Sequence, residues 1–298
     1  MEVGHPRKSK TGGTISNRLG GLVRKRTMQG SRLIGRVEKK TYAGVILKRE
    51  FFTVAPVLAV EESNIIVRLR FKSEEERKAH RDHISRQRHV LLVNENFRPG
   101  DLYLTLTFNR KNECHSYADA KKLTVNYIRR VRRVCKNAVI FWYIGRGENT
   151  KRYHVHILAS GAPEHIMVSK WGMGEIVDVS KLWDHVFYDG VDHGADYTGL
   201  ANYLFDHWEP EQGPHRYHHT RNAGKPTVEA FRASRRKYTV EHPPAAPKGY
   251  KLVSSRTTDY GYQCFTYVRE PRKTFLDPDH KIRKPKRSRK RRTQNRKE

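Results

Sequence analysis

The 298-residue sequence has few cysteines, few acidic residues and no long apolar run. Cys114, Cys135 and Cys264 stand at unrelated spacings, so the sequence predicts neither a disulfide framework nor a cysteine-based zinc site, and we expect reduced thiols. No segment approaches the roughly 20 apolar residues of a membrane span, and the first twenty residues lack the apolar region of a signal peptide. These absences predict a cytoplasmic protein without a membrane partner.

Basic residues dominate the charge of the chain. The 60 Lys and Arg against 31 Asp and Glu give a formal net charge of +29, which favours a polyanionic partner, above all a nucleic acid. An acidic membrane surface would need an amphipathic helix with a broad apolar face or a lipidation motif, and the sequence has neither. Because hydrophobic residues make up only 36% of the chain, we expect part of it to stay outside any core.

Composition divides the chain into five segments. A flexible basic arm is expected over residues 1–40, and accessory strands with a charged helix over 41–98. The main core is expected over 99–245, further strands over 246–270, and a basic disordered tail over 271–298. Residues at the end of this tail are almost all basic or polar, so they cannot bury enough surface to offset the entropy of ordering.

The main core alternates between strand and helix patterns. Apolar runs predict strands at 102–108, 138–144, 152–160 and 175–179, and helical spacing predicts helices at 116–135, 163–170 and 196–207. A Gly-rich turn over 145–149 makes the second and third strands a hairpin. The order strand, helix, strand, strand, helix, strand predicts an α+β fold, with an antiparallel sheet and helices on one face in the ferredoxin-like manner.

Two histidines lie two residues apart within the third of these strands. Side chains alternate along a strand, so His154 and His156 point to one face and can share a metal ion. The alternative is a pair of exposed or hydrogen-bonded histidines in a chain that contains 16. Two other groups of histidines lack the carboxylate or cysteine ligands that would complete a zinc site. They are His80 with His83, and His215 with His218 and His219.

Three segments in a fixed order resemble the motifs of HUH endonucleases, specifically the rolling-circle replication initiators of bacterial plasmids and phages. They are residues 104–108 (LTLTF), 153–157 (YHVHI) and 197–204 (YTGLANYL), within a resemblance that covers about 75–245. The resemblance implies an RRM-like palm and a nickase and ligase acting on single-stranded origin DNA. A tyrosine of such an enzyme forms a 5′-phosphotyrosyl link and frees a 3′ hydroxyl for the host polymerase and helicase.

The resemblance also implies the roles of individual residues. Tyr203 is expected to be the nucleophile, and His154 and His156 to hold Mn²⁺ or Mg²⁺. Tyr197 lies six residues before Tyr203, about 240° around a helix, so we expect a single catalytic tyrosine. Glu148 in the turn is the nearest carboxylate and is the predicted third ligand, although a solvated turn glutamate is equally typical of this position.

Phosphate contacts are predicted from residues around these motifs. Relatives often place a lysine one turn after the tyrosine, where this chain has Asp206 and His207, so Lys225, Arg221 or His207 is expected to replace it. Thr105 and Thr107 are expected either to contact DNA or to be ordinary strand residues. The predicted DNA-binding residues are Thr105, Thr107, Arg152, Arg221 and Lys225.

Two other functions are compatible with the same sequence. A mobilisation relaxase or a transposase of the HUH type would use the same metal and tyrosine, although the length of the chain and its lack of an attached helicase region favour a replication initiator. A non-catalytic nucleic-acid-binding protein, such as one that coats RNA, would explain the charge alone. An adduct between protein and DNA that survives detergent distinguishes the enzymes from this last class.

Overall fold

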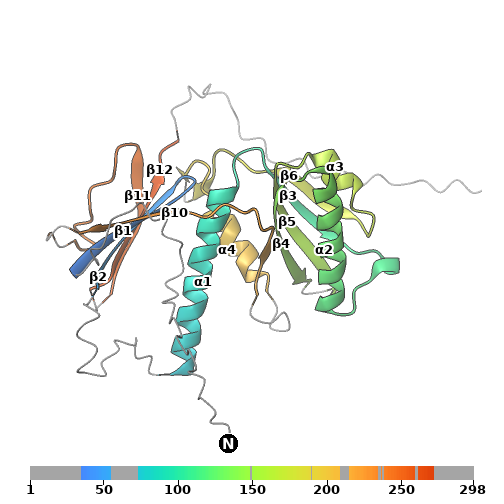
Figure 1. Cartoon of the computed structure of the whole chain (residues 1–298), viewed down its shortest axis with the longest axis horizontal. Helices are drawn as coiled ribbons and strands as arrows, with labels where there is room; N and C mark the ends of the chain where they lie inside the picture. The colour runs from blue at the N-terminus through green and yellow to red at the C-terminus, as the bar shows by residue number, and fades with distance from the viewer. Residues whose placement is uncertain are drawn as a thin grey trace, which may run out of the picture.

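The protein has two antiparallel five-stranded sheets separated by a long helix (Figure 1). This computed structural model describes residues 35–54, 73–147, 150–188, 190–208, 215–233, 236, 238–258 and 261–271. The helices are α1 (Glu74–Asn96), η2 (Arg110–Asn112), α2 (Tyr117–Val134), α3 (Glu164–Ser169) and α4 (Thr198–Asp206). The strands are β1 (Gly35–Ala43), β2 (Ile46–Val54), β3 (Leu102–Thr107), β4 (Val139–Arg146), β5 (Tyr153–Ser160), β6 (Ile176–Lys181), β7 (Phe187–Tyr188), β8 (Val191–Asp192), β9 (His218–His219), β10 (Thr227–Arg232), β11 (Tyr250–Thr257) and β12 (Gln263–Arg269). The α+β class predicted from the sequence is therefore confirmed.

The central sheet has the order β6-β3-β5-β4-β9, and every neighbouring pair is antiparallel. Helices α2 and α3 cover one face, where Leu104, Ile140 and Ile157 are buried. The sequence predicted helices on one face only, and this part of the prediction is wrong because α4 and α1 cover the other. Phe141, Tyr143 and Leu158 are buried on that second face. The unbroken apolar run of β4 is the pattern expected of a strand that is buried on both faces.

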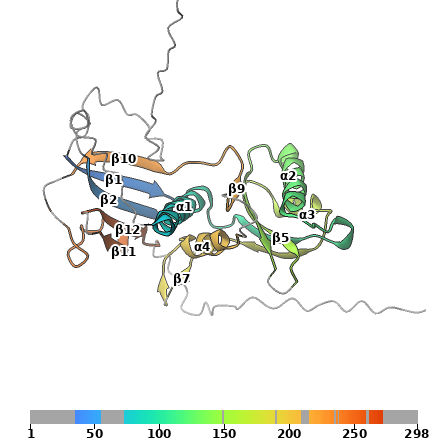
Figure 2. The same ribbon diagram turned by 90° about the horizontal axis from the view of Figure 1, so that it is seen from below.

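The long helix α1 connects the two sheets. Ser73 caps its first turn by accepting a hydrogen bond from the Glu76 backbone N–H, and three glutamates in that turn oppose the positive end of the helix dipole. Only its last two turns are buried, where Val90 and Val93 contact the core. Figure 2 shows α1 nearly end-on, with one sheet on one side and α4 on the other.

The terminal sheet has the order β10-β1-β2-β12-β11, so strands from both ends of the chain pair with each other. Two predicted boundaries differ from this arrangement. Residues 35–40, predicted to belong to the flexible arm, form the first part of β1, and residues 227–232, predicted to lie in the main core, form β10 and pair with β1. The rest of the predicted arm and tail, residues 1–34 and 272–298, lies outside the described residues.

Within the described ranges, no helix combines the length and the apolar character that crossing a membrane requires. Cys114, Cys135 and Cys264 are all free thiols.

A buried histidine joins α1 to the central sheet. The His89 Nε2 atom lies 2.8 Å from the Tyr143 hydroxyl oxygen, and its ring packs against Phe205 and Tyr217. Burial lowers the pKa of His89 to about 3. Between this value and the ordinary value near 6.5, the unfolded chain binds a proton at His89 that the folded chain does not bind. The free energy of unfolding that the neutral, buried His89 contributes is therefore lost as the pH falls from about 6.5 toward 3.

We expect His89→Gln to flatten the acid dependence of the unfolding free energy. Between pH 6.5 and pH 4 the wild type should lose about 1.4 kcal/mol per pH unit more than the variant, because one proton is taken up on unfolding. Urea unfolding at pH 6, 5 and 4 measures this difference. His165→Gln, at an exposed position on α3, is the matched control and should leave the slope unchanged. Parallel slopes for wild type and His89→Gln would contradict the assignment.

Candidate metal centre

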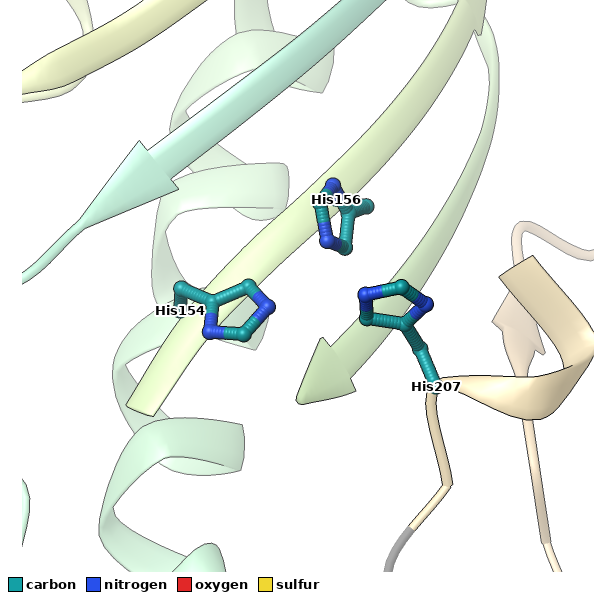
Figure 3. A group of neighbouring side chains, drawn as sticks. All are labelled: His154, His156 and His207. Atoms are coloured by element: carbon teal, nitrogen blue, oxygen red, sulfur yellow. The ribbon is translucent and has the colours of Figure 1, made fainter. Parts of the chain in front are cut away.

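Three histidine rings from two elements meet on one face of the central sheet. His154 and His156 come from β5, and His207 follows the last residue of α4 (Figure 3). The ring centroids are 4.9 Å apart for His154 and His156, 4.6 Å for His156 and His207, and 5.8 Å for His154 and His207. One ring nitrogen from each lies within 4.8 Å of the others, and across the described ranges this is the one such group of three or more ligand residues.

Hydrogen bonds hold one nitrogen of each ring and leave the other for a ligand. His207 Nδ1 donates to the Tyr203 carbonyl at 3.0 Å, and His154 bonds to the backbone of Arg152. His156 Nδ1 lies 2.8 Å from the Tyr103 hydroxyl and 3.2 Å from the Thr105 hydroxyl. Metal-binding histidines in proteins are oriented in this way by partners of their second nitrogen.

The second nitrogen of His156 is the clearest sign that the three rings fit a ligand. His156 is only 4% exposed, and among the described residues its Nε2 atom has no hydrogen-bond partner. A buried polar atom without a partner costs roughly 1–3 kcal/mol, so native proteins rarely leave one unsatisfied. A cation at the centre of the three rings would satisfy it, and the residues present therefore fit a metal ion.

Burial also keeps these ligands in the protonation state that a metal requires. Burial, with a smaller contribution from the neighbouring His154 and His207, lowers the pKa of His156 to about 3. Burial likewise lowers the pKa of His154 below its ordinary value, with His207 adding to the effect. Both rings are neutral at physiological pH and can donate a lone pair without first losing a proton.

Gly145 makes room for the third histidine. It lies opposite His154 in the β4–β5 pairing. A Cβ atom at this position would lie 2.9 Å from His154 Nε2 and 3.2 Å from His207 Cδ2. The ring of His207 therefore occupies the space into which a side chain on β4 would extend.

We expect Gly145→Ala to weaken metal binding without unfolding the protein. The added methyl group meets two side chains rather than backbone, so the rings are displaced and the sheet is kept. Titration with Mn²⁺ should give an affinity about tenfold lower, comparable to the loss of an orienting partner. Gly172→Ala, where a Cβ meets nothing within 4 Å, is the control. Equal affinities for wild type and Gly145→Ala would contradict the packing argument.

Tyr203 lies beside the histidines with an accessible ring. Its ring centroid is 4.3 Å from that of His207 and 6.0 Å from that of His156, and the residue is 50% exposed. Tyr197 differs in every respect, because it is buried and its hydroxyl donates to the Trp183 carbonyl. Of the two tyrosines in the third motif, only Tyr203 shares the site.

Ion pairs from α1 fix the end of α4 that carries the site. Arg86 forms two hydrogen bonds with the Asp206 carboxylate, at 2.9 and 2.5 Å, and this interaction lowers the pKa of Asp206. Arg216 pairs with Asp82 at 2.8 Å, and both guanidinium groups lie over the ring of Phe205. Because Asp206 and His207 are adjacent, α1 contributes to the position of the third histidine.

None of the family models, curated proteins or solved structures that were compared with the chain matches it.

The other predicted site residues lie at different distances from the histidines. Thr105 contacts His156, and Thr107 pairs across the strands with His154 while its hydroxyl donates to the Glu175 carbonyl. Arg152 donates to the Phe108 carbonyl and lines a pocket with Tyr153. Glu148, the predicted third ligand, lies outside the described residues.

Arg221 and Lys225 are not brought to the histidines. Their loop is attached to the start of β4, where Asn222 donates to the carbonyls of Asn137 and Ala138. The histidines lie beside Gly145 near the other end of that strand, roughly 20 Å away at about 3.3 Å per residue. Neither side chain therefore takes the place of the phosphate-binding lysine that the resemblance implies after the tyrosine.

His207 is the candidate ligand that sequence reasoning did not assign. It was considered only as a substitute for a phosphate-binding lysine, whereas the structure groups it with His154 and His156. The available signal was its spacing of four residues from Tyr203, one helical turn, which places both on one side of α4. Tyr103, the partner of His156 Nδ1, was likewise missed, although its alternation with Thr105 puts both on the histidine face.

Proposed function

We propose that the protein is a metal-dependent, site-specific single-strand DNA nickase and ligase that initiates rolling-circle replication. One observation carries this proposal: the accessible phenol ring of Tyr203 stands beside a group of three histidines with the features of a metal site. The net charge of +29 supports a DNA substrate. The order of the three motifs along the chain supports the choice of enzyme class.

The finer architecture also supports a palm of the ferredoxin-like kind. The elements β3, α2, β4, β5, α3 and β6 follow one another as strand, helix, strand, strand, helix, strand. The first strand, β3, lies between β5 and β6 in the sheet, so β3 and β4 flank β5 as in a split βαβ unit. This order puts the first motif directly beside the histidine strand.

The reaction proposed for Tyr203 conserves the number of phosphoester bonds. The phenol loses its proton as its oxygen attacks the phosphorus atom, and the bond from phosphorus to the 3′ oxygen breaks. The 3′ oxygen takes up one proton and leaves as a hydroxyl, so no proton is gained or lost overall. The phosphotyrosyl ester stores the energy of the broken bond, so resealing needs no nucleotide cofactor. A neutral phenol is a weak nucleophile toward an anionic phosphodiester, and the site must compensate for this.

The donor set favours Mn²⁺ over Mg²⁺ as the resident ion. Three imidazoles suit first-row transition metals, whereas Mg²⁺ prefers carboxylate, carbonyl and water oxygens. A divalent ion held there would polarise a non-bridging phosphate oxygen and neutralise the charge that develops in the transition state. The 3′ hydroxyl that the reaction frees would prime the host polymerase, with a host helicase unwinding the duplex ahead of it.

A random library of hairpin-forming oligonucleotides tests the proposal without knowledge of the origin. The library carries a label at the 3′ end, and the protein is incubated with it and Mn²⁺, denatured in detergent and recovered. A 5′-phosphotyrosyl link leaves the 3′ label on the protein, whereas a 5′ label should leave as a free shorter strand. Sequencing of the bound strands should give one preferred cleavage site, and chelation by EDTA should abolish the adduct. Tight binding without any adduct in Mn²⁺ would favour a non-catalytic binding protein instead.

A further inference from the structure

Four aromatic side chains are exposed among the described residues, and three of them belong to one region of the fold. Trp183 is 57% exposed, Phe187 55% and Tyr203 50%, whereas the fourth, Phe231, lies on the edge strand β10 of the terminal sheet. Trp183 precedes the small hairpin of β7 and β8, and Phe187 is part of it. Figure 2 shows β7 beside α4, extending outward from it. Open aromatic surface is therefore concentrated on the helix of the proposed nucleophile and on the hairpin beside it.

Two hydrogen bonds fix this hairpin segment to the start of α4. The Tyr197 hydroxyl donates to the Trp183 carbonyl at 2.9 Å, and the Gly199 N–H donates to the Tyr188 hydroxyl at 2.8 Å. A glycine leaves room for the second contact, because a Cβ atom at position 199 would lie 2.6 Å from the Tyr188 hydroxyl oxygen. Gly199 precedes Tyr203 by one helical turn, so the hairpin is anchored on the same side of α4, about 6 Å along the helix axis from Tyr203.

The pairing of the hairpin directs Phe187 away from α4. Phe187 pairs with Asp192 and Tyr188 with Val191, and successive side chains of a strand point to opposite faces. Tyr188 faces α4, so Phe187 lies on the outer face, where Asp192 is held by His185 Nδ1 at 2.6 Å. A short two-stranded hairpin is only marginally stable by itself, and apolar rings that it leaves open are suited to contact with another molecule.

The segment that carries these rings differs in charge from the rest of the chain. Residues 182–215 contain no lysine or arginine, although these make up 60 of the 298 residues. The formal charges within the segment are all negative, and the Asp184 side chain, next to Trp183 in the chain, is 73% exposed. Such a surface repels phosphates, so it suits the uncharged faces of bases better than the backbone of a nucleic acid.

We propose that Trp183 and Phe187 stack against unpaired bases of the single-stranded DNA substrate, close to the phosphate that Tyr203 attacks. Stacking on aromatic rings holds single strands without reading their sequence, because every base has a π face. The anchor of the hairpin is about 6 Å from Tyr203, or about two nucleotides at roughly 3.4 Å each. This inference rests on the proposed function, because it identifies the strand that Tyr203 would cleave as the occupant.

Binding of two oligonucleotides of equal charge tests this contact separately from the chemistry. A Tyr203→Phe parent, which cannot form the tyrosyl ester, is titrated against fluorescein-labelled dT20 and against a 20-mer of abasic sites. We expect the parent to bind dT20 at least about tenfold more tightly than the abasic strand, because only dT20 has bases to stack.

Variants of the two rings should lose affinity for dT20 alone. Trp183→Ala and Phe187→Ala should each weaken dT20 binding about tenfold and leave abasic binding within about twofold, since a stacked base is lost and no charge is removed. Trp183→Phe keeps an aromatic face and should retain most of the affinity. Phe231→Ala removes an exposed phenylalanine from the terminal sheet, so it is the matched control and should leave both affinities within about twofold of the parent.

Salt dependence distinguishes stacking from contact with the backbone. The slope of log affinity against log salt concentration reflects the number of phosphates that a protein neutralises. Trp183→Ala and Phe187→Ala should therefore lower the dT20 affinity at every salt concentration without changing this slope.

The outcomes separate the two proposals. If the parent binds dT20 but both alanine variants behave like Phe231→Ala, the stacking inference is overturned and the nickase proposal stands. Equal weakening of dT20 and abasic binding, or a flatter salt slope, would also overturn it, because backbone contacts would then have been lost. So would equal affinity of the parent for the two strands. If the parent binds neither oligonucleotide, both proposals fail.

Discussion

Replacing Tyr203 by phenylalanine is expected to lower the rate of adduct formation by at least roughly a thousandfold, as removal of a catalytic nucleophile does in other enzymes. The substitution removes one oxygen atom and little packing, because the ring is half exposed and stays beside His207. Mn²⁺ affinity and binding of single-stranded DNA should remain within about twofold of wild type, since the hydroxyl is neither a metal ligand nor a cation. Time courses with the strand selected from the library measure the rate.

Tyr197→Phe is the matched control for this experiment. It also removes one phenolic oxygen six residues away, but that oxygen donates to the Trp183 carbonyl and is buried away from the histidines. We expect a modest loss of stability, about 1 kcal/mol for one buried hydrogen bond, and adduct formation near the wild-type rate. Adduct formation by Tyr203→Phe together with its loss in Tyr197→Phe would move the nucleophile to Tyr197.

Replacing His207 by alanine is expected to lower Mn²⁺ affinity by at least roughly a hundredfold. Substitution of a partner that merely orients a ligand costs about 10–100-fold in affinity, so loss of a ligand itself should cost at least the upper end of that range. The variant should also lose adduct formation, because the ion and Tyr203 would no longer be coupled through α4. Isothermal titration calorimetry with Mn²⁺ measures the affinity directly.

His165→Ala controls for the general loss of a histidine, because this residue is exposed on α3, which covers the face of the central sheet opposite the histidines. Its Mn²⁺ affinity should equal that of wild type. An unchanged affinity in His207→Ala would show that the two β5 histidines bind the ion without a third imidazole. A third ligand would then be expected from the turn after β4, where Glu148 lies in the sequence.

Short-range patterns predicted the part of the site that lies on one element. The period of two along β5 was sufficient to place His154 and His156 on one face, and helical spacing was sufficient to separate Tyr197 from Tyr203 on α4. The position of His207 depends instead on how α4 docks against the sheet. That docking is set by residues far away in the chain, such as Arg86 on α1 and the space left by Gly145.

The terminal sheet could not be predicted for a related reason. Its central contact pairs β2 with β12, and the partners Leu47 and Tyr267 are separated by most of the chain. Strand propensity indicates that a segment is extended but does not identify its partner when the connection is not a short turn. Residues 35–40 were assigned to a flexible arm because their basic composition outweighed the alternation that places Val37 inward.

We propose that three histidines hold a divalent ion within reach of the Tyr203 hydroxyl. Anomalous diffraction from crystals grown with Mn²⁺ can test this arrangement, because the anomalous signal locates the ion independently of the protein coordinates. We expect one strong peak about 2 Å from a ring nitrogen of each of His154, His156 and His207, with the Tyr203 ring facing it. A peak on any other set of residues, or no peak at these rings when Mn²⁺ is saturating, would contradict it.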